Sequence, residues 1–342
     1  MRGKVSCIKA GFIIAAPLYC GGFDSQKTSE IRVPSLRGAL RNWWRYANGG
    51  RFASIGDMMS AESAIFGSAR PGHSRQGILM SLTVDGCEHS VDPTHKSSLK
   101  YLGYEVCDKR AGMAAGARFT LTLRSRGLDE AQLATLRGAI SLMGLLGGIG
   151  ARVRRGFGSL TLTHLEGDGT TASAWTCPTT PQEMSKRLTQ ILGTNPPNVM
   201  PSFPAFAAGS RVVWLCESRT PDGVLDRLQH ALQELSKDLA VTSLAGYPKK
   251  IMLGLPRGAW KPEQQNRRAS PLVFHVHQCG KDAYAGLVTL ISGPFLPQGE
   301  KVKGPTGAVP GPDNHVEELA SALYSLAEPS RGFGQAQEVY RR

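Results

Sequence analysis

The sequence Arg-Gly-Phe-Gly occurs twice in the chain, and this repeat constrains the fold more than any other feature. One copy spans residues 155–158 and the other spans residues 331–334. Each copy lies between the last predicted helix and the last predicted strand of its half. This placement favours a duplicated architecture in which the same order of elements is used twice. The period is too long for a solenoid of short repeats.

The first half of the chain has the hydrophobic pattern of alternating strands and helices. Leu36, Leu40, Trp43 and Ala47 recur at helical spacing, and alternating apolar residues indicate the strands. We predict strands over 4–16, 78–84, 118–125 and 159–165, helices over 34–47 and 129–146, and a further short helix over 57–66. The order of strand, helix, strand, strand, helix, strand is typical of the ferredoxin-like fold.

The second half repeats this order. We predict strands over 211–216, 271–277, 284–292 and 338–340, and helices over 222–239 and 314–326. The prolines are concentrated between the two halves. The sequence therefore predicts an α+β chain of two fused ferredoxin-like domains, 1–170 and 211–342, joined by a Pro-rich linker over 171–210.

The charge of the chain points to a polyanionic partner. Its 342 residues include 40 Lys and Arg against 27 Asp and Glu, a formal net charge of +13. No run of 18 uncharged apolar residues exists, so we expect no membrane span. The seven cysteines form no Cys-x-x-Cys pair, which indicates a reducing cytoplasm. We expect no metal and no cofactor, because no ligand set has metal spacing.

A basic stripe lies on the first predicted helix. Arg37, Arg41 and Arg45 are four residues apart, and no acidic residue occurs between Ile31 and Arg51. Like charges at this spacing repel one another. An anion along the stripe would relieve the repulsion, since guanidinium groups and helix N-termini both suit phosphate oxygens. We therefore predict that the stripe binds RNA phosphates together with Ser35, a plausible helix cap, although a solvated helix face is the simpler alternative.

A glycine-rich loop over 147–159 follows the helix at 129–146. It has five glycines and fits neither the dinucleotide fingerprint nor the Gly-Lys-Ser/Thr phosphate loop. Little side-chain bulk would let backbone amides approach a ligand closely. We predict that Gly150, Arg152, Arg154, Arg155 and Gly156 bind phosphodiesters, against the alternative of a purely structural loop.

Four cations of the second half are weaker candidates. Lys249, Lys250, Arg267 and Arg268 are not phased on a predicted helix. A second RNA contact and a merely soluble loop explain them equally well.

Catalytic patterns are absent from the sequence. It has no Gly-x-Ser-x-Gly elbow, no His-Glu-x-x-His and no paired carboxylates. We interpret Glu62 as a capping or arginine-pairing residue. Asp24 could serve a nuclease, but such a residue is more often part of a turn.

Four segments of the chain carry a family resemblance. They are Pro17-Leu18 with Gly21-Gly22, residues 30–45 with Arg37-Gly38-Ala39-Leu40-Arg41 and Trp43-Trp44, residues 61–68 ending in Ile65-Phe66-Gly67-Ser68, and the loop end at 154–159. Together they resemble the RAMP superfamily of CRISPR proteins, and within it the first-subunit family of the Cmr (type III-B) effector complex. The strong matches cover about residues 10–160, and weaker ones lie at 267–272 and 295–297.

This resemblance implies two ferredoxin-like domains and a non-catalytic RNA-binding subunit that acts in antiviral defence. Such a subunit lies at the end of an RNA-guided complex, near the 3′ end of the guide RNA (crRNA) and the 5′ part of the paired target RNA, beside other RAMP subunits. The arginines of the stripe and of the loop would then contact backbone phosphates and leave sequence to base pairing.

Two other functions remain open. One is a RAMP endoribonuclease that processes guide precursors; such enzymes use a histidine near the N-terminus, and the chain has none before His73. The other is a general single-stranded RNA-binding protein, which would need base-stacking aromatic residues that the strands do not supply.

Overall fold

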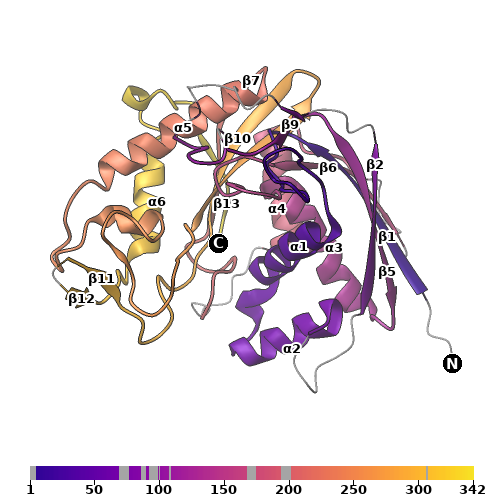
Figure 1. Cartoon of the computed structure of the whole chain (residues 1–342), viewed down its shortest axis with the longest axis horizontal. Helices are drawn as coiled ribbons and strands as arrows, with labels where there is room; N and C mark the ends of the chain where they lie inside the picture. The colour runs from indigo at the N-terminus through magenta and orange to yellow at the C-terminus, as the bar shows by residue number, and fades with distance from the viewer. Residues whose placement is uncertain are drawn as a thin grey trace.

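The computed structural model describes residues 5–68, 77–85, 90–91, 99, 101–107, 109–167, 175–193, 202–305 and 307–342. Figure 1 shows the two halves of the chain side by side, the first from indigo to magenta and the second from orange to yellow. No helix of the described residues is long and apolar enough to cross a membrane. The six cysteines within the described ranges are free thiols.

The first half has the predicted ferredoxin-like order. Its strands are β1 (Val5–Ile14), β2 (Ile78–Asp85), β5 (Arg118–Arg126) and β6 (Leu160–Gly167), and its helices are α1 (Val33–Asn48), α2 (Ile55–Phe66) and α3 (Glu130–Leu146). The strands form one antiparallel sheet in the order β2-β5-β1-β6. The short strands β3 (Ser90–Val91) and β4 (Gly112–Met113) and the single turn η1 (Gly49–Arg51) complete this half.

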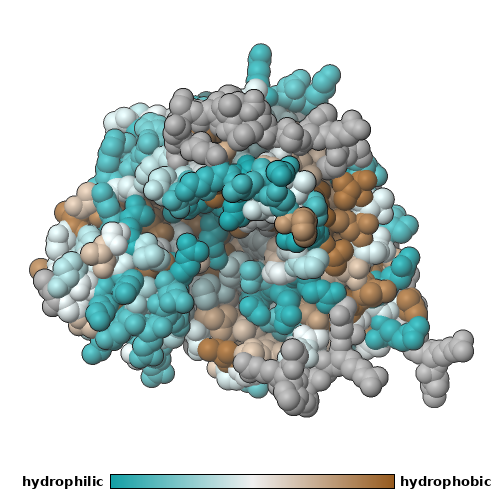
Figure 2. All heavy atoms as spheres, in the orientation of Figure 1, coloured by the Kyte–Doolittle hydropathy of each residue, from teal (hydrophilic) through white to brown (hydrophobic). Residues whose placement is uncertain are grey.

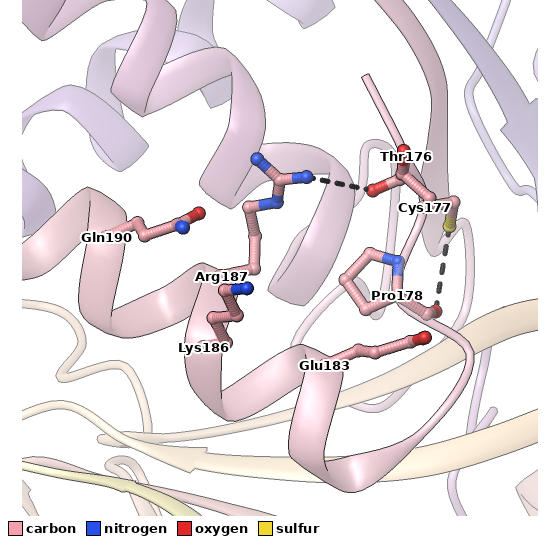
Figure 3. A pocket seen from close by; sticks show the side chains of 7 residues that line it. All are labelled: Thr176, Cys177, Pro178, Glu183, Lys186, Arg187 and Gln190. Atoms are coloured by element: carbon pink, nitrogen blue, oxygen red, sulfur yellow. Dashed lines mark hydrogen bonds between the residues drawn. The ribbon is translucent and has the colours of Figure 1, made fainter. Parts of the chain in front are cut away.

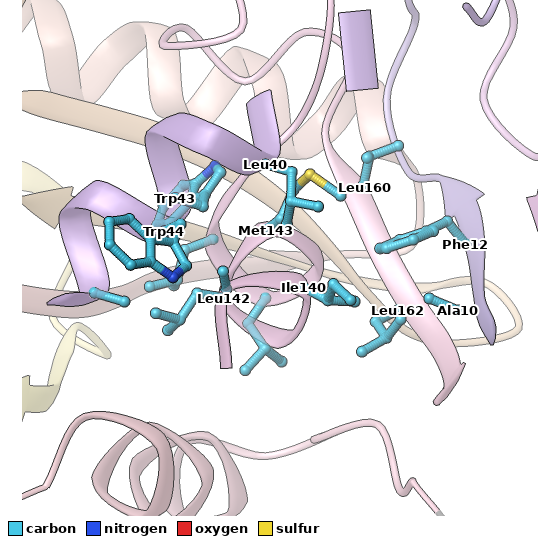
Figure 4. Packing of buried hydrophobic residues seen from close by; sticks show 14 of the residues in the cluster. Ala10, Phe12, Leu40, Trp43, Trp44, Ile140, Leu142, Met143, Leu160 and Leu162 are labelled. Carbon is cyan, nitrogen blue, oxygen red and sulfur yellow. The ribbon is translucent and has the colours of Figure 1, made fainter. Parts of the chain in front are cut away.

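The core of this half lies between the sheet and the helices (Figure 4). Phe12 of β1 stacks on Phe119 of β5, with ring centroids 5.2 Å apart. Trp43 and Trp44 of α1 are both buried, and the indole of Trp44 donates a hydrogen bond to Thr135 over 3.0 Å. Trp43 packs edge-on against Tyr46, and Trp44 lies between Phe52 and Thr135 of α3. Neither indole is therefore free to stack on an RNA base.

The second half repeats the topology. Its strands are β7 (Arg211–Ser218), β9 (Leu272–Gly280), β10 (Ala283–Leu290) and β13 (Gln337–Arg341), and its helices are α5 (Pro221–Asp238) and α6 (His315–Ser325). The sheet order β13-β7-β10-β9 places the first strand and the third in the centre, as in the first half. Further short elements are η3 (Lys249–Leu253), β8 (Lys261–Pro262), β11 (Val302–Gly304), β12 (Gly307–Val309) and η4 (Pro329–Arg331). The predicted α+β class with two ferredoxin-like domains is confirmed.

The range predicted as a linker contains a helix, α4 (Pro181–Leu192). Thr180 caps its N-terminus by accepting a hydrogen bond from Glu183 N. Met184, Leu188 and Leu192, at helical spacing, are buried against α3 and β13. The prediction of a Pro-rich linker therefore missed an element of the core; residues 171–174 and 194–201 of that linker lie outside the described ranges, and the exact domain bounds stay a prediction.

The glycine-rich loop joins the two halves. Strand β9 is an edge strand, and the backbone N–H of Phe274 donates to Arg154 O over 3.2 Å. Two residues further along the same strand, the backbone N–H of Val276 donates a hydrogen bond to the hydroxyl of Ser159 over 3.0 Å. Phe157, buried in the loop, belongs to the hydrophobic cluster that contains Leu225 and Leu228 of α5. The loop thus gives hydrogen-bond partners to backbone N–H groups on the open edge of the second sheet, and its Phe157 extends the second hydrophobic core.

Candidate nucleic-acid interface

The arginine stripe of α1 surrounds one buried carboxylate. Glu62 of α2 is 1% exposed, and its carboxylate pairs with Arg41 and Arg45. Arg45 Nε donates to Oε2 over 2.5 Å and Nη2 donates to Oε1 over 2.9 Å, a two-pronged contact. Arg41 also donates to the carbonyl oxygen of Gly67, which ends α2. The prediction that Glu62 pairs with arginine is confirmed.

The carboxylate of Glu62 changes the electrostatic argument for an anion bound along the stripe. The sequence argument favoured an external anion because no acid lies within α1, but Glu62 of α2 supplies a carboxylate from the neighbouring helix. Arg37, the third member, donates to Phe66 O over 3.4 Å, and burial followed by the charge of Arg41 lowers its pKa. Two of the three guanidinium groups, those of Arg41 and Arg45, share one carboxylate, so the stripe as a whole keeps an excess of positive charge. Repulsion within α1 alone therefore does not demand a ligand.

Ser35 does not cap α1. The helix begins at Val33, and Arg32 occupies the cap position without a side-chain hydrogen bond. The hydroxyl of Ser35 instead accepts a hydrogen bond from the thiol of Cys20, over 3.5 Å. Pro34 in the first turn explains the early start, because its fixed φ suits that position.

Packing accounts for the glycines of the loop. A Cβ on Gly158 would lie 2.1 Å from Ile149 O, and one on Gly148 would lie 2.4 Å from Gly158 O. Gly150 has φ +89°, and a Cβ there would lie 2.7 Å from Tyr19 O. A Cβ on Gly156 would meet Leu225 of the second half at 3.0 Å. Packing within the chain therefore explains these glycines, so their number does not by itself indicate close approach to RNA, and the RNA contacts of Gly150 and Gly156 stay a prediction.

The loop arginines hold different parts of the chain. Arg152 is exposed, has φ +57° and donates to Tyr104 O over 2.6 Å. Arg154 donates to Ser270 O over 2.6 Å and to the hydroxyl of Tyr46 on α1. Arg154 thereby connects the loop with both α1 and the start of β9.

Arg155, the third loop arginine, is half-buried. Its guanidinium lies 5.9 Å from the ring centroid of Phe274. Burial, then the charge of Arg257, lowers the pKa of Arg155 to about 10. No described residue accepts a hydrogen bond from its Nη1 atom, which is shielded from solvent.

The cations of the second half separate into two kinds. Arg268 is half-buried, stacks on Phe295 at 4.2 Å and donates to Phe295 O over 2.6 Å. Burial and then Arg154 lower the pKa of Arg268 to about 9. Lys249 pairs with Glu318 of α6 at 2.8 Å, and its neighbour Lys250 is half-buried. Arg267 is exposed, so of these four it is best placed to meet RNA.

The surface around these groups is largely polar. Figure 2 shows hydrophilic side chains gathered over β11 and β12 and around the hollow in the middle of the face, between the two halves. Hydrophobic side chains are grouped on the opposite side of this view. The face therefore offers polar surface on both halves of the chain.

A small pocket lies beside α4, and its side chains show no sign of a reactive site. It has a volume of about 260 Å³ and is lined by Thr176, Cys177, Pro178, Glu183, Lys186, Arg187 and Gln190 (Figure 3). Burial raises the pKa of the Cys177 thiol to about 12, so the thiol is not a nucleophile at neutral pH. Arg187 donates to Thr176 O over 3.2 Å and covers the Trp175 ring at 4.7 Å. Both contacts pack the Arg187 side chain against its own chain.

The acids near the stripe have structural roles. The carboxylate of Asp24 accepts a hydrogen bond from Gln26 N over 3.0 Å and lies 3.6 Å from the Lys27 ammonium. The contact with Gln26 is typical of an Asx turn. Within the described ranges, no three His, Cys, Asp or Glu side chains are grouped to hold a metal ion.

The structure brings the arginine stripe and the glycine-rich loop together, but it places two of the predicted lysines elsewhere. The stripe and the loop meet through Tyr46 and Arg154, whereas Lys249 and Lys250 lie apart on η3 beside α6. Sequence reasoning overlooked Tyr46, Tyr101 and, as a site residue, Arg257. No spacing rule could have found them, because each lies far along the chain from the loop arginines.

Comparisons with known proteins agree with this architecture. Residues 14–161 match the model of the RAMP superfamily. The chain is 26% identical over 289 residues to CRISPR system Cmr subunit Cmr1-1 of Pyrococcus furiosus, covering 79% of this chain and 82% of that protein.

Two solved structures have a similar fold. The crystal structure of Cmr1 from Pyrococcus furiosus (apo form) matches with a TM-score of 0.63 and 18% identity over 98% of this chain and 99% of that one. A chain of the cryo-EM structure of the type III-B Cmr-beta complex bound to cognate target RNA matches with a TM-score of 0.56 and 12% identity, over 94% of this chain and 99% of that one.

Proposed function

We propose that this chain, a RAMP-superfamily protein similar to the first subunit of Cmr complexes, is an RNA-binding subunit of a type III-B CRISPR effector complex. It would act in the cytoplasm beside other RAMP subunits and contact the guide RNA near its 3′ end, the paired target RNA, or both. Its similarity to CRISPR system Cmr subunit Cmr1-1 and to a chain of the Cmr-beta complex bound to target RNA supports this assignment.

The contact between Arg154 and Tyr46 carries the proposal. It joins the glycine-rich loop to α1, so two basic segments that are distant in sequence lie next to each other. Arg152 is exposed and the stripe arginines are half-buried, so their charges can reach solvent. Guanidinium groups on a rigid scaffold suit backbone phosphates, and contacts of this kind position RNA without reading its sequence.

We further propose that the chain binds RNA without cleaving it. Asp24 is engaged in its own turn, and Glu62 is held by two guanidinium groups, so neither carboxylate is available to take a proton from a ribose hydroxyl. Metal-independent cleavage of a repeat hairpin by the purified protein would contradict this and favour a guide-processing endoribonuclease.

The test is the salt dependence of RNA binding. We would compare the wild type with Arg152→Asn, because asparagine tolerates the positive φ of this position. Single-stranded RNA loses log affinity against log salt with a slope of about −0.7 per neutralised phosphate, so this variant should flatten the slope by about 0.7. Lys186→Ala on α4 removes the same charge elsewhere and should leave the slope unchanged. Equal slopes for all three proteins would contradict the proposed interface.

A further inference from the structure

The two copies of Arg-Gly-Phe-Gly place their arginines in opposite electrostatic settings. Arg331, in the second copy, lies 2.8 Å from Asp238 and 3.6 Å from Glu234, both on α5. The hydrogen bond with Asp238 raises the pKa of Arg331. Arg155, in the first copy, forms no ion pair with a described carboxylate. The same motif therefore has its charge balanced in one half and unbalanced in the other.

The unbalanced arginine faces a cluster drawn from three distant segments. Tyr101, which is 45% exposed, places its hydroxyl 3.4 Å from the hydroxyl of Ser236 on α5. Arg257 donates to the same Ser236 hydroxyl over 3.3 Å. Arg155 is half-buried, and its Nη1 atom is shielded from solvent. The first half contributes Tyr101 and Arg155, and the second contributes Arg257 and Ser236.

The charges in this cluster have one sign. The groups that most affect the pKa of Arg155, besides its burial, are Arg257, the phenol of Tyr101, Arg152 and Arg154. Burial raises the pKa of Tyr101, but the hydrogen bond with Ser236 and the charges of Arg257 and Arg155 outweigh it and lower that pKa overall. A cluster that favours the anionic form of a phenol also favours a bound anion. Partly buried charges such as that of Arg155 are screened less by salt than exposed ones, so its field persists at physiological ionic strength.

We propose that Arg257 and Tyr101, together with the half-buried charge of Arg155, form a phosphate-binding site at the seam between the two halves. The inference rests on the proposed function, because the phosphate it assigns to this site belongs to the RNA backbone. A guanidinium fork and a phenol hydroxyl supply the directional donors that a phosphodiester accepts. An RNA strand held here would cross from the first half to the second.

The experiment measures binding of a labelled single-stranded RNA and the melting temperature of the free protein. Arg257→Gln should lower RNA affinity about fivefold to tenfold at moderate salt and flatten the salt slope by about 0.7. The melting temperature of the free protein should stay the same or rise, because one of two mutually repelling cations is gone. Arg257→Lys should keep the slope. Arg219→Ala, an exposed arginine of the second half, is the charge-matched control.

A second measurement uses inorganic phosphate as the probe. At matched ionic strength, phosphate should raise the melting temperature of the wild type more than that of Arg257→Gln. If phosphate distinguishes the two proteins while their RNA affinities are equal, the site takes a free phosphate and its assignment to RNA is overturned. If RNA binding and phosphate response are both unchanged in Arg257→Gln, there is no such site. The proposed RNA-binding function has its own separate readout, because it fails if the wild type itself shows no salt-dependent RNA binding.

Discussion

The guanidinium of Arg45 holds both carboxylate oxygens of Glu62, at 2.5 Å and 2.9 Å, across the contact between α1 and α2. Arg41 shares the same carboxylate. One buried acid therefore fixes the direction of two arginines whose outer parts still reach solvent.

Replacement of this acid should destabilise the fold. Glu62→Gln leaves two partly buried guanidinium groups without a counter-charge, and we expect the free energy of unfolding to fall by about 2 to 3 kcal/mol. Chemical denaturation measures this loss. Glu166→Gln, which removes an exposed partner of Lys9 at 3.7 Å, should change stability by less than about 0.5 kcal/mol. Equal effects of the two substitutions would contradict the structural role of Glu62.

The last glycines of the two motif copies should respond differently to alanine. Gly158 has φ +62°, and a Cβ there would lie 2.1 Å from the backbone oxygen of Ile149. Gly334 has nothing within 4 Å of its Cβ position. We expect Gly158→Ala to cost about 3 kcal/mol or more, or to prevent folding, and Gly334→Ala to change stability by less than about 1 kcal/mol. Thermal melting of the two variants, with soluble yield as a second readout, decides the comparison.

Two neighbouring arginines should separate stability from binding. Arg268→Ala removes donors to the carbonyl oxygens of Phe295 and Met252 and should cost about 2 to 4 kcal/mol in the free energy of unfolding. Arg267→Ala removes an exposed charge and should leave stability within about 0.5 kcal/mol while weakening RNA binding. Chemical denaturation measures the free energy of unfolding of each variant, and RNA titration measures its RNA affinity. The interpretation of Arg268 as a structural residue does not survive if its loss is harmless to folding.

Acid should destabilise the protein through its buried histidines, and burial lowers the pKa of one of them, His275, well below its usual value. Burial lowers the pKa of His277 and of His315 to about 4 in the folded state, against about 6.5 when unfolded. Between these values the unfolded chain binds more protons, so stability is complete above about pH 6.5 and is lost as pH falls towards 4. Each group contributes up to about 1.4 kcal/mol per pH unit in that window. Denaturation at pH 7.5 and 5 measures the difference. His315→Asn should reduce it, and substitution of the exposed His164 by Gln should not.

The sequence predicted the architecture because the relevant signals are local. Leu36, Leu40 and Trp43 are buried on one face of α1 as their spacing indicated. Helix α4 was missed although Thr180, Pro181 and the spacing of its buried residues were present, because the surrounding prolines dominated the interpretation.

The site could be predicted only in part. The stripe and the loop were recognised from their composition, but the carboxylate that pairs with the stripe comes from another helix. The two copies of Arg-Gly-Phe-Gly are identical in sequence and differ only in what surrounds Arg155 and Arg331. Tyr101 and Arg257 approach Arg155 through tertiary packing, which no local pattern encodes.

Phe157 has a consequence for how the protein is made. The residue is synthesised with the first half, yet its ring is buried in the hydrophobic cluster that contains Leu225 and Leu228 of α5. Tyr19 of the first half packs edge-on against the ring, but the remaining surroundings of Phe157 are complete only once α5 has left the ribosome. A chain cut between the two halves would therefore expose apolar surface of this cluster on each fragment.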